Sequence, residues 1–488
     1  MFEQQASHFS PQSRQNGHYL CLHGHFYQPP REDPFTGLIP IEPSAGPFAN
    51  YNERITFECY RPNAELGNFT AMSFNFGPTL LAWLERSHSD VYQRIIASDH
   101  AHLQRYGVGN ALAQVYNHTI LPLATCADKR TQIRWGLRDF LQRYGHPAQG
   151  MWLAETAVDL ETLELLADEG VLYTILAPWQ AARPIDTNQP YRIRLPHGKS
   201  ITVFFYNSLL SGGVSFNDHM TSNADEFVSS VVMSQLNAQK SFDREAQLIM
   251  VATDGELYGH HKPWRDKFLA YLLTSGAECH GMEICTPGRY LQLFPPTHEV
   301  ELYTPSAWSC SHGLARWSTG CSCTEGDSSW KSALLSALTN INGKASQLFE
   351  QTAGELVADP WLMRDEYLAL HYGWEEPALF WDRHCKKNTL VTQEQIWRLR
   401  MLLEAQFYHQ YSFTSCAFFF EDLNRIEPRN AIAFARRAIS LTWQALGIDL
   451  QSDFVQDLAS AHSWQTGLSG ADLYRRLPIV DEGLLPRA

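Results

Sequence analysis

The sequence lacks long hydrophobic runs. No stretch of its 488 residues reaches the roughly 20 consecutive apolar residues that a membrane-spanning helix requires. The first residues, MFEQQASHFSPQSRQNG, are polar and lack the apolar segment of a secretory signal. We therefore expect neither a membrane-spanning helix nor a secretory signal, and we expect residues 1–17 to form a disordered tail.

Basic residues are also few. The chain has 38 Lys and Arg against 52 Asp and Glu, which gives a formal net charge of −14. A nucleic-acid partner would need clustered Lys and Arg to neutralise its phosphates, so the sequence argues against such a partner. Without a secretory signal, the ten cysteines are expected to be reduced thiols and the protein to be cytoplasmic. Nothing in the sequence indicates an oligomeric state.

Short apolar segments alternate with helical patterns over the first two-thirds of the chain. The runs VLYTILAP, ITVFFYNS and QLIMVAT are continuously apolar, as expected of parallel strands buried on both faces. Strand–helix alternation predicts an α/β fold, either a barrel or an open parallel sheet, in residues 18–327. Residues 28–62 are rich in Pro and Gly and predict a long irregular loop.

The pattern changes after about residue 328. Apolar residues then recur at the 4, 3, 4, 3 spacing of one helix face. They are Leu334, Leu338, Ile341, Ala345 and Leu348. We expect residues 328–447 to form a helical domain packed on the barrel, while residues 448–488 give no clear pattern.

Polar side chains follow five of the predicted strands, at the point where each strand ends. In a parallel barrel these ends meet at one mouth, where functional residues gather. The residues in such positions are His23, His25, Gln28, His118, Trp152, Glu155, Asp254, Glu256, Trp308, His312 and Arg316. A single histidine or carboxylate after a strand is more often structural, so the interpretation rests on the five clusters together.

Two carboxylates from different strands can face each other across such a mouth. This arrangement suits cleavage of a glycosidic bond, in which one carboxylate attacks the anomeric carbon and the other protonates the leaving oxygen. The acid needs a raised pKa, which burial or a neighbouring carboxylate supplies. Trp152 and Trp308 are expected to stack on sugar rings, and the histidines and Arg316 to hydrogen-bond sugar hydroxyls.

Four segments together form a recognisable set of motifs: HFYQPP with His25 and Gln28, NHTILPLA with His118, WLAE with Glu155, and TDGELYGHH with Asp254. In these segments the sequence resembles glycoside hydrolase family 57, in the subgroup with an extra helical C-terminal region of unknown function. The similarity implies an incomplete (β/α)7 TIM-like barrel followed by helices. It also implies retaining chemistry on α-glucans, as oligo- or polysaccharides, by an amylase, a 4-α-glucanotransferase or a branching enzyme, without a cofactor.

By this resemblance Glu155 is the nucleophile and Asp254 is the general acid/base. Glu256 is the rival for the acid role, because it lies two residues from Asp254 and points the same way in an extended chain. We interpret Glu256 as a residue that holds a histidine or an arginine in place. His260 and His261 are expected either to bind substrate or to cap the loop.

Two other classes of function stay open. A metal-dependent polysaccharide deacetylase-like hydrolase would use Asp and His ligands, for which HGH and DGELYGHH are candidates, and would hold a metal ion at the barrel mouth. A non-catalytic carbohydrate-binding protein would keep the fold and bind sugar without turnover.

A separate group of metal-ligating residue types lies in WSCSHGLARWSTGCSC. Cys310, His312, Cys321 and Cys323 supply the four ligands that a closed tetrahedral zinc site requires. Their spacing, C-x-H-x8-C-x-C, is not that of a standard zinc knuckle. Free buried thiols, or a His312 that recognises sugar, explain the same residues, so the sequence leaves the metal question open.

Overall fold

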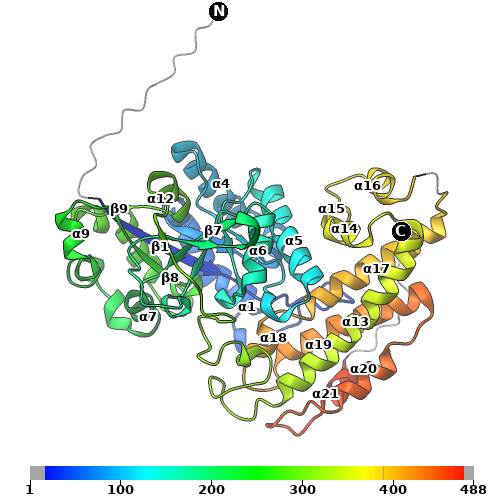
Figure 1. Cartoon of the computed structure of the whole chain (residues 1–488). Coiled ribbons are helices and arrows are strands. Elements are labelled where there is room, and N and C mark those ends of the chain that lie inside the picture. The colour runs from blue at the N-terminus through cyan, green and yellow to red at the C-terminus, as the bar shows by residue number, and fades with distance from the viewer. Residues whose placement is uncertain (1–16, 388–389, 478–488) are drawn as a thin grey trace, which may run out of the picture.

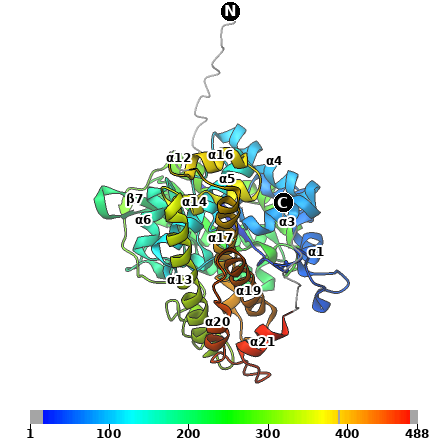
Figure 2. The same cartoon turned by 90° about the vertical axis from the view of Figure 1, so that its right-hand side faces the viewer.

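The computed structural model of the chain describes residues 17–387 and 390–477. The tail predicted at residues 1–17 lies outside the described residues except for Gly17, and so does the end of the C-terminal segment that gave no pattern. Two parts pack side by side, one rich in strands and one built from long helices (Figure 1). Figure 2 shows the same molecule with the helical part in front.

Seven parallel strands of the described chain form an incomplete barrel. An isolated bridge joins β2 (Ser73–Phe76) to the residues that enter β3 (Ala113–Gln114). Another joins the residues that enter β4 (Met151–Trp152) to β5 (Tyr173–Leu176). The end of β7 (Ser200–Phe205) is linked to β8 (Gln247–Asp254) by the Asn207 N–H, which donates to the Met250 carbonyl oxygen at 2.7 Å. The order around the barrel is β8 (Gln247–Asp254), β1 (His18–Phe26), β2 (Ser73–Phe76), β3 (Ala113–Gln114), β4 (Met151–Trp152), β5 (Tyr173–Leu176) and β7 (Ser200–Phe205). The expected (β/α)7 barrel is confirmed.

Side chains alternate between the two faces of these strands. In β1, Leu20 and Leu22 pack under the surrounding helices, whereas Tyr19 and Cys21 pack inside the barrel. A strand repeats every two residues, so the same alternation places His23 and His25 on the inner face. In β8 the inner residues Leu248, Met250 and Ala252 lead in the same way to Asp254, at the barrel mouth.

Three short strands and a shell of helices complete this part. β6 (Tyr191–Arg194) runs antiparallel to β7, β9 (Glu283–Ile284) pairs with β1, and β10 (His298–Glu299) pairs with β6. The helices are α1 (Tyr51–Ile55), α2 (Arg61–Glu65), α3 (Pro78–Ser87), α4 (Ser89–Tyr106), α5 (Cys126–Tyr144), α6 (Leu160–Asp168), α7 (Ser208–Phe216), α8 (Ala224–Glu226), α9 (Ala238–Phe242), α10 (Arg265–Tyr271), α11 (Ala277–Cys279) and α12 (Pro287–Leu293).

The segment predicted as an irregular loop, residues 28–62, is irregular only in its first half. Asn50 caps α1 by accepting a hydrogen bond from the Glu53 N–H at 3.0 Å, and helical turns then continue into α2. Most of the Pro and Gly residues that suggested a loop precede Asn50. The prediction is wrong for residues 51–62, because one N-cap residue starts a helix that average composition does not reveal.

The chain is helical after residue 329. In α13 the predicted apolar face is buried except for Leu348, which is half-buried. The helices of this part are α13 (Trp330–Leu356), α14 (Pro360–Asp365), α15 (Tyr367–His371), α16 (Pro377–His384), α17 (Gln393–Tyr411), α18 (Cys416–Phe419), α19 (Ile426–Leu446), α20 (Gln451–Leu458) and α21 (Gly470–Arg476).

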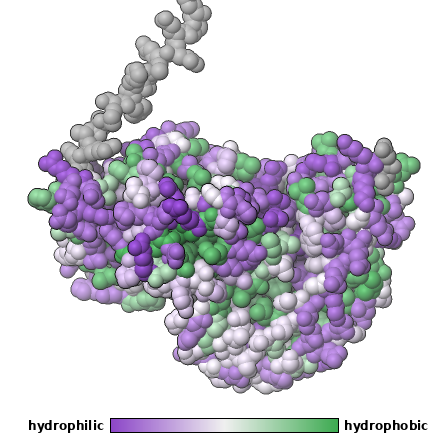
Figure 3. All heavy atoms as spheres, viewed as in Figure 1, coloured by the Kyte–Doolittle hydropathy of each residue, from purple (hydrophilic) through white to green (hydrophobic). Residues whose placement is uncertain are grey.

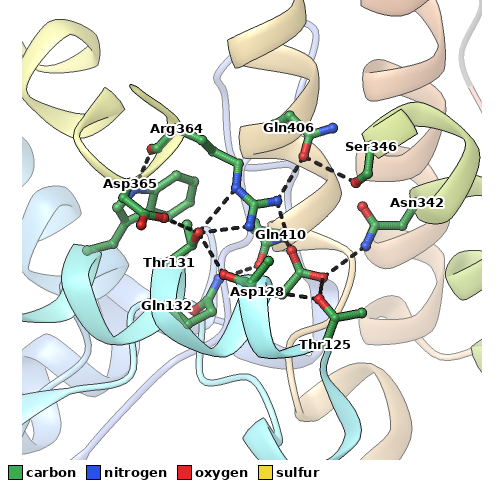
Figure 4. Close-up of polar contacts among 12 residues, drawn as sticks. Thr125, Asp128, Thr131, Gln132, Asn342, Ser346, Arg364, Asp365, Gln406 and Gln410 are labelled. Atoms are coloured by element: carbon green, nitrogen blue, oxygen red, sulfur yellow. Dashed lines mark hydrogen bonds and ion pairs between the residues drawn. The ribbon is translucent and has the colours of Figure 1, made fainter. Parts of the chain in front are cut away.

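A buried polar network joins the helical part to the barrel. Arg364, at α14, is fully buried and donates to Asp128 Oδ1 of α5 at 2.8 Å and to Gln406 Oε1 of α17 at 3.0 Å (Figure 4). Gln410 of α17 donates to the same Asp128 oxygen at 2.7 Å. A buried charge is tolerated only when it is paired and hydrogen-bonded, so Arg364 of α14 depends on groups that α5 and α17 supply.

Hydrophilic residues cover most of the face seen in Figure 3, and hydrophobic residues form separate patches on it. None of the helices in the described part of the chain is long and apolar enough to cross a membrane. All ten cysteines are free thiols.

Candidate active site

A cleft of about 890 Å³ opens at the carboxyl ends of the barrel strands. The helical part supplies one of its walls, with Phe419, Phe420 and Arg425 among the lining residues. The predicted site residues that line it are His25, Gln28, His118, Glu155, Asp254, Glu256, His260 and His261. The structure thus brings both predicted carboxylates to one cleft.

Glu155 follows β4 in a strained turn. Its φ is 56° and that of Thr156 is 48°, in the left-handed region, which costs a residue other than glycine about 1–3 kcal/mol. The Trp308 N–H donates to the Glu155 carbonyl oxygen at 3.0 Å and holds the turn. Strain of this kind persists only where the surroundings fix it, and here it places a carboxylate at the cleft.

The Glu155 carboxylate is held by two donors on one oxygen. Trp308 Nε1 donates to Oε2 at 2.8 Å, and Ser309 Oγ donates to the same atom at 2.7 Å. Burial raises the pKa of Glu155, while these two hydrogen bonds and the nearby Arg316 charge oppose the rise. No group of the described residues bonds to Oε1, so this oxygen is available to a ligand.

Asp254 ends β8 with its side chain exposed to the cleft. The protein around it replaces most of the bulk water, and this burial, together with the charge of Glu155, raises the pKa of Asp254 to about 7. A carboxylic acid with this pKa holds its proton for about half of the time at neutral pH. Asp254 can therefore either give or take a proton in the physiological range.

Glu256 lies deeper than Asp254 and is nearly fully buried. Its Oε1 accepts hydrogen bonds from the Tyr60 hydroxyl at 2.7 Å and from the Tyr27 N–H at 3.1 Å. Burial and the charge of Asp254 raise the pKa of Glu256 to about 8, against the effect of the Tyr60 bond. The prediction that Glu256 holds a histidine or an arginine is wrong for the carboxylate, whose two partners among the described residues are a tyrosine hydroxyl and a tyrosine backbone N–H. The Glu256 carbonyl oxygen, in contrast, does contact histidines, by accepting hydrogen bonds from the N–H groups of His260 and His261 at 3.1 and 3.0 Å.

Two predicted substrate contacts lie beneath the cleft. Trp152 has no exposed surface, and its ring stacks on those of His23 and His25 at centroid distances of 4.9 and 5.0 Å. His23 is also fully buried and bonds to Ser73 and Asn75. The prediction that His23 and Trp152 contact sugar is therefore corrected, because inward-facing residues below the strand ends fill the barrel interior.

A pair of histidines forms part of the cleft floor. His25 Nε2 and His118 Nε2 lie 3.1 Å apart, and His118 Nδ1 lies 2.5 Å from Ser415 Oγ. Burial lowers the pKa of His118 to about 3, so its imidazole is neutral and one of the two rings donates to the other. These hydrogen bonds orient both rings.

The helical part reaches this floor through the turn that precedes α18. Ser415 bonds to His118, and the Thr414 hydroxyl lies 2.7 Å from the Tyr27 hydroxyl. An antiparallel bridge between Thr119 and Thr414 joins the two parts beside these contacts. The helical part is therefore built into the site.

The other predicted residues have different places. His260 Nδ1 lies 2.5 Å from Glu58 Oε2, while His261 is exposed at the cleft. Trp308 is half-buried beside Glu155. His312 and Arg316 are not among the cleft-lining residues, because both belong to the cysteine-containing segment, where Arg316 donates to the Cys323 carbonyl oxygen. Arg316 nevertheless lies close to the cleft, because its guanidinium lies over the ring of the cleft-lining Phe419 at 4.3 Å.

Sequence reasoning missed four residues that hold the site: Tyr27, Tyr60, Ser309 and Ser415. Two of them lie in segments that the sequence analysis singled out, because Ser309 follows Trp308 and Tyr27 stands in the HFYQPP motif. Tyr60 and Ser415 belong to no motif, and each forms a hydrogen bond with a residue about 200 or more positions away in the sequence.

Two family models match the chain. One, described as glycosyl hydrolase family 57, matches residues 22–303, and the other, described as a domain of unknown function (DUF3536), matches residues 327–481. Among curated proteins, alpha-amylase 1 of Dictyoglomus thermophilum is 24% identical over 106 residues, which is 22% of this chain and 15% of the amylase. The matched region is thus a small part of that relative's length.

Solved structures share the fold. An exo-type maltose-forming amylase from Pyrococcus sp. ST04 aligns with a TM-score of 0.69 at 13% identity, over 90% of this chain and 82% of its own. A branching enzyme from Pyrococcus horikoshii aligns with a TM-score of 0.61 at 16% identity, over 96% and 98% of the two chains. At such identities the likeness shows a common fold that extends through both parts of the chain.

Proposed function

Because the chain belongs to glycosyl hydrolase family 57, we propose that it hydrolyses or transfers α-glycosidic bonds of an α-glucan, with Glu155 as the nucleophile and Asp254 as the general acid/base. One observation carries the proposal. Glu155 and Asp254 line the same cleft, and the charge of Glu155 helps to raise the pKa of Asp254 to about 7. The amylase and the branching enzyme that share the fold support α-glucans as the substrate class.

The two carboxylates have the environments that double displacement needs. Trp308 and Ser309 stabilise the anionic form of Glu155, which attacks the anomeric carbon through its free oxygen. Asp254 is protonated for about half of the time at neutral pH, and in this form it gives its proton to the leaving glycosidic oxygen. A retaining enzyme requires a separation of about 5–5.5 Å between its two carboxyl groups. We expect the Glu155 and Asp254 carboxyl groups to be this far apart in a structure with bound substrate.

The second half of the reaction uses the same pair in reverse. When Glu155 forms the covalent glycosyl ester, its negative charge is lost. The pKa of Asp254 then falls, because one of the two causes that raised it has gone. Asp254 becomes a base that deprotonates the acceptor, which is water in hydrolysis or a sugar hydroxyl in transfer.

We further propose that the helical part forms an acceptor-side or donor-side wall for the glucan chain. Phe419 and Phe420 offer aromatic faces at the cleft, and Arg425 lies over the Phe420 ring at 4.1 Å. Aromatic faces and charged hydrogen-bond donors are suited to the apolar faces and hydroxyls of glucose units. This role would give the domain of unknown function a part in substrate binding.

The arrangement of the histidines favours this proposal over the deacetylase-like alternative. That alternative needs His23 and His25 as metal ligands. Both side chains instead bond to protein partners, His23 to Ser73 and Asn75, and His25 to Asn75 and His118. A cytoplasmic location stays a prediction.

Product analysis tests the proposal. The enzyme is incubated with a maltooligosaccharide of one length and with amylose, and the products are separated by chromatography before and after enzymatic debranching. Shorter products alone indicate hydrolysis, longer and shorter products together indicate transfer, and debranchable products indicate branching. Full activity in Glu155→Gln, or binding of α-glucans without any turnover, would contradict the proposal.

A further inference from the structure

Four metal-ligating side chains of the segment after β10 lie together, outside the cleft. The Sγ atoms of Cys310, Cys321 and Cys323 and a ring nitrogen of His312 all lie within 4.8 Å of one another. It is the one such group of three or more Cys, His, Asp and Glu side chains in residues 17–387 and 390–477. We propose that this group, here called the Cys3His cluster, binds a structural Zn²⁺ ion.

Two of the ligand-to-ligand distances within the Cys3His cluster match tetrahedral zinc coordination. Zn–S bonds of about 2.3 Å and a Zn–N bond of about 2.0–2.1 Å at tetrahedral angles place two sulfur atoms about 3.8 Å apart, and sulfur and nitrogen about 3.6 Å apart. Cys310 Sγ and Cys321 Sγ are 3.7 Å apart, and Cys323 Sγ and His312 Nδ1 are 3.4 Å apart. Each of the two close pairs therefore already has the spacing of two ligands on one ion.

The sulfur atoms of Cys310 and Cys321 are too far apart to form a disulfide. A disulfide needs a bond of about 2.05 Å, and Cys310 and Cys321 are both free thiols. Backbone N–H groups also face the sulfurs, that of Ser311 toward Cys323 and that of Cys323 toward Cys321. Such outer donors stabilise thiolates that ligate a metal.

A buried cation beside the cluster supplies an independent argument. Lys331 has no exposed surface, and its Nζ donates to Thr324 Oγ1 at 3.0 Å. No carboxylate of the described residues forms an ion pair with it within 4.0 Å. Cys321, Cys310 and the more distant Glu421 favour its charged form, and the Arg316 charge opposes it. Three thiolates and one neutral imidazole around Zn²⁺ carry a net charge of −1, which would compensate Lys331.

Zinc binding by the Cys3His cluster needs no reactant other than the ion itself. Each of the three thiols loses its proton to solvent as its sulfur bonds to Zn²⁺, and the His312 imidazole binds as the neutral ring. Cys310 is buried whereas His312 is exposed, so the ion can enter from solvent and close the site from the outside. A soft donor set of three thiolates and one imidazole selects Zn²⁺ over the oxygen-preferring cations.

The proposed ion would fasten the segment that holds Glu155. Cys310 directly follows Ser309 and Trp308, the two donors to the Glu155 carboxylate. The ion would cross-link this segment to Cys321 and Cys323 and so hold both donors in place. Zinc binding itself does not depend on the proposed function.

The test uses the full chain, purified with reducing agent from zinc-replete cells without added metal. Mass spectrometry of metals is expected to find one zinc per chain, and replacement by Co²⁺ is expected to give thiolate charge-transfer and intense visible bands of tetrahedral cobalt. Cys323→Ser and Cys321→Ser should lose both signals, while Cys279→Ser, a change of an exposed cysteine outside the cluster, should keep them.

Chelation supplies a second measurement for the case in which the variants fold poorly. Removing zinc from the wild-type chain should lower its Tm, and adding zinc back should restore it. Sub-stoichiometric zinc without a cobalt spectrum, a different metal in stoichiometric amount, a native Cys310–Cys321 disulfide, or full zinc content in folded Cys323→Ser would each overturn the proposal.

Discussion

Trp308 and Glu155 are joined twice. The indole Nε1 of Trp308 donates to Glu155 Oε2 at 2.8 Å, and the Trp308 backbone N–H donates to the Glu155 carbonyl oxygen at 3.0 Å. One residue thus fixes both the charge and the backbone turn of the proposed nucleophile.

Trp308→Phe is expected to weaken the first of these bonds and to keep the second. A hydrogen bond to a charged group contributes about 1.5–3 kcal/mol. Loss of the indole donor should therefore lower kcat/KM by about 10- to 100-fold and move the acidic limb of the pH profile upward, because the anionic form of Glu155 becomes less stable. The control, Trp264→Phe, changes an exposed tryptophan and should leave the profile unchanged. An unmoved acidic limb in Trp308→Phe would mean that the indole does not stabilise the nucleophile.

The wild-type enzyme is expected to have a bell-shaped pH profile. As pH rises through about 7, Asp254 loses the proton that it gives to the leaving group, so kcat/KM falls. As pH falls, Glu155 is protonated and its attack is lost, at a pH above the usual range of a free glutamate because burial raises its pKa. Initial rates across pH on one substrate measure both limbs, and a flat profile between pH 6 and pH 9 would contradict the assignment of the acid, since Asp254 titrates at about 7.

Asp254→Asn and Glu256→Gln separate the two candidates for the acid. Loss of general-acid catalysis should lower the rate of Asp254→Asn by about 10²–10⁴-fold and abolish the alkaline limb. An activated aryl glycoside, whose leaving group needs no proton, should be affected much less. Glu256→Gln should keep the alkaline limb, because the Tyr60 hydroxyl can still donate to an amide oxygen. If the alkaline limb were lost only in Glu256→Gln, Glu256 and not Asp254 would be the general acid.

Phe420→Ala tests the wall that the helical part contributes. Loss of one aromatic face is worth about 0.5–1.5 kcal/mol, so KM for long maltooligosaccharides should rise roughly two- to tenfold. The shortest substrate that is cleaved should show a smaller change if Phe420 binds a distant sugar unit. Phe216→Ala, which removes a highly exposed ring outside the cleft lining, serves as the matched control. Equal KM values for wild type and Phe420→Ala at every maltooligosaccharide length would contradict the proposal that the helical part forms a substrate-binding wall.

Arg364→Met is expected to destabilise the chain by about 3–5 kcal/mol, because it leaves Asp128 as a buried charge without its cation. Lys344→Met breaks the ion pair with Asp453, in which both side chains are about half exposed, and should cost at most about 1 kcal/mol. Urea unfolding measures both variants. The double variant Arg364→Met with Asp128→Asn should recover part of the loss. If Arg364→Met and Lys344→Met had equal effects, the network of Figure 4 would not be an energetic link between the two parts.

That Glu155 and Asp254, the proposed catalytic pair, line one cleft could be predicted from the sequence because of strand geometry. Asp254 ends β8 and Glu155 follows the end of β4, and the ends of parallel strands meet at one mouth of the barrel whatever their distance along the chain. The contacts that tune the pair were not accessible. Trp308 was singled out for sugar stacking, and its bonds to Glu155 depend on a left-handed turn that no residue type announces.

The errors have a common physical origin. His23 lies two positions before His25, and Trp152 three positions before Glu155, so both lie deeper in the barrel than the cleft-lining residues and are covered by their neighbours. Periodicity gives the face of a strand and not the depth along it. The partner of Glu256 was misassigned because a buried carboxylate needs donors of any kind, and tyrosines are as suitable as basic residues.

The turn at Thr414 and Ser415 constrains how the sequence of this protein can evolve. These residues come from beyond α17, yet they bond to Tyr27 and His118 in the floor of the cleft. A substitution on either side of these bonds must be matched on the other to keep the floor intact. The barrel and the helical region are therefore bound to evolve together, and an exchange of the helical region between homologues would also replace part of the floor of the cleft.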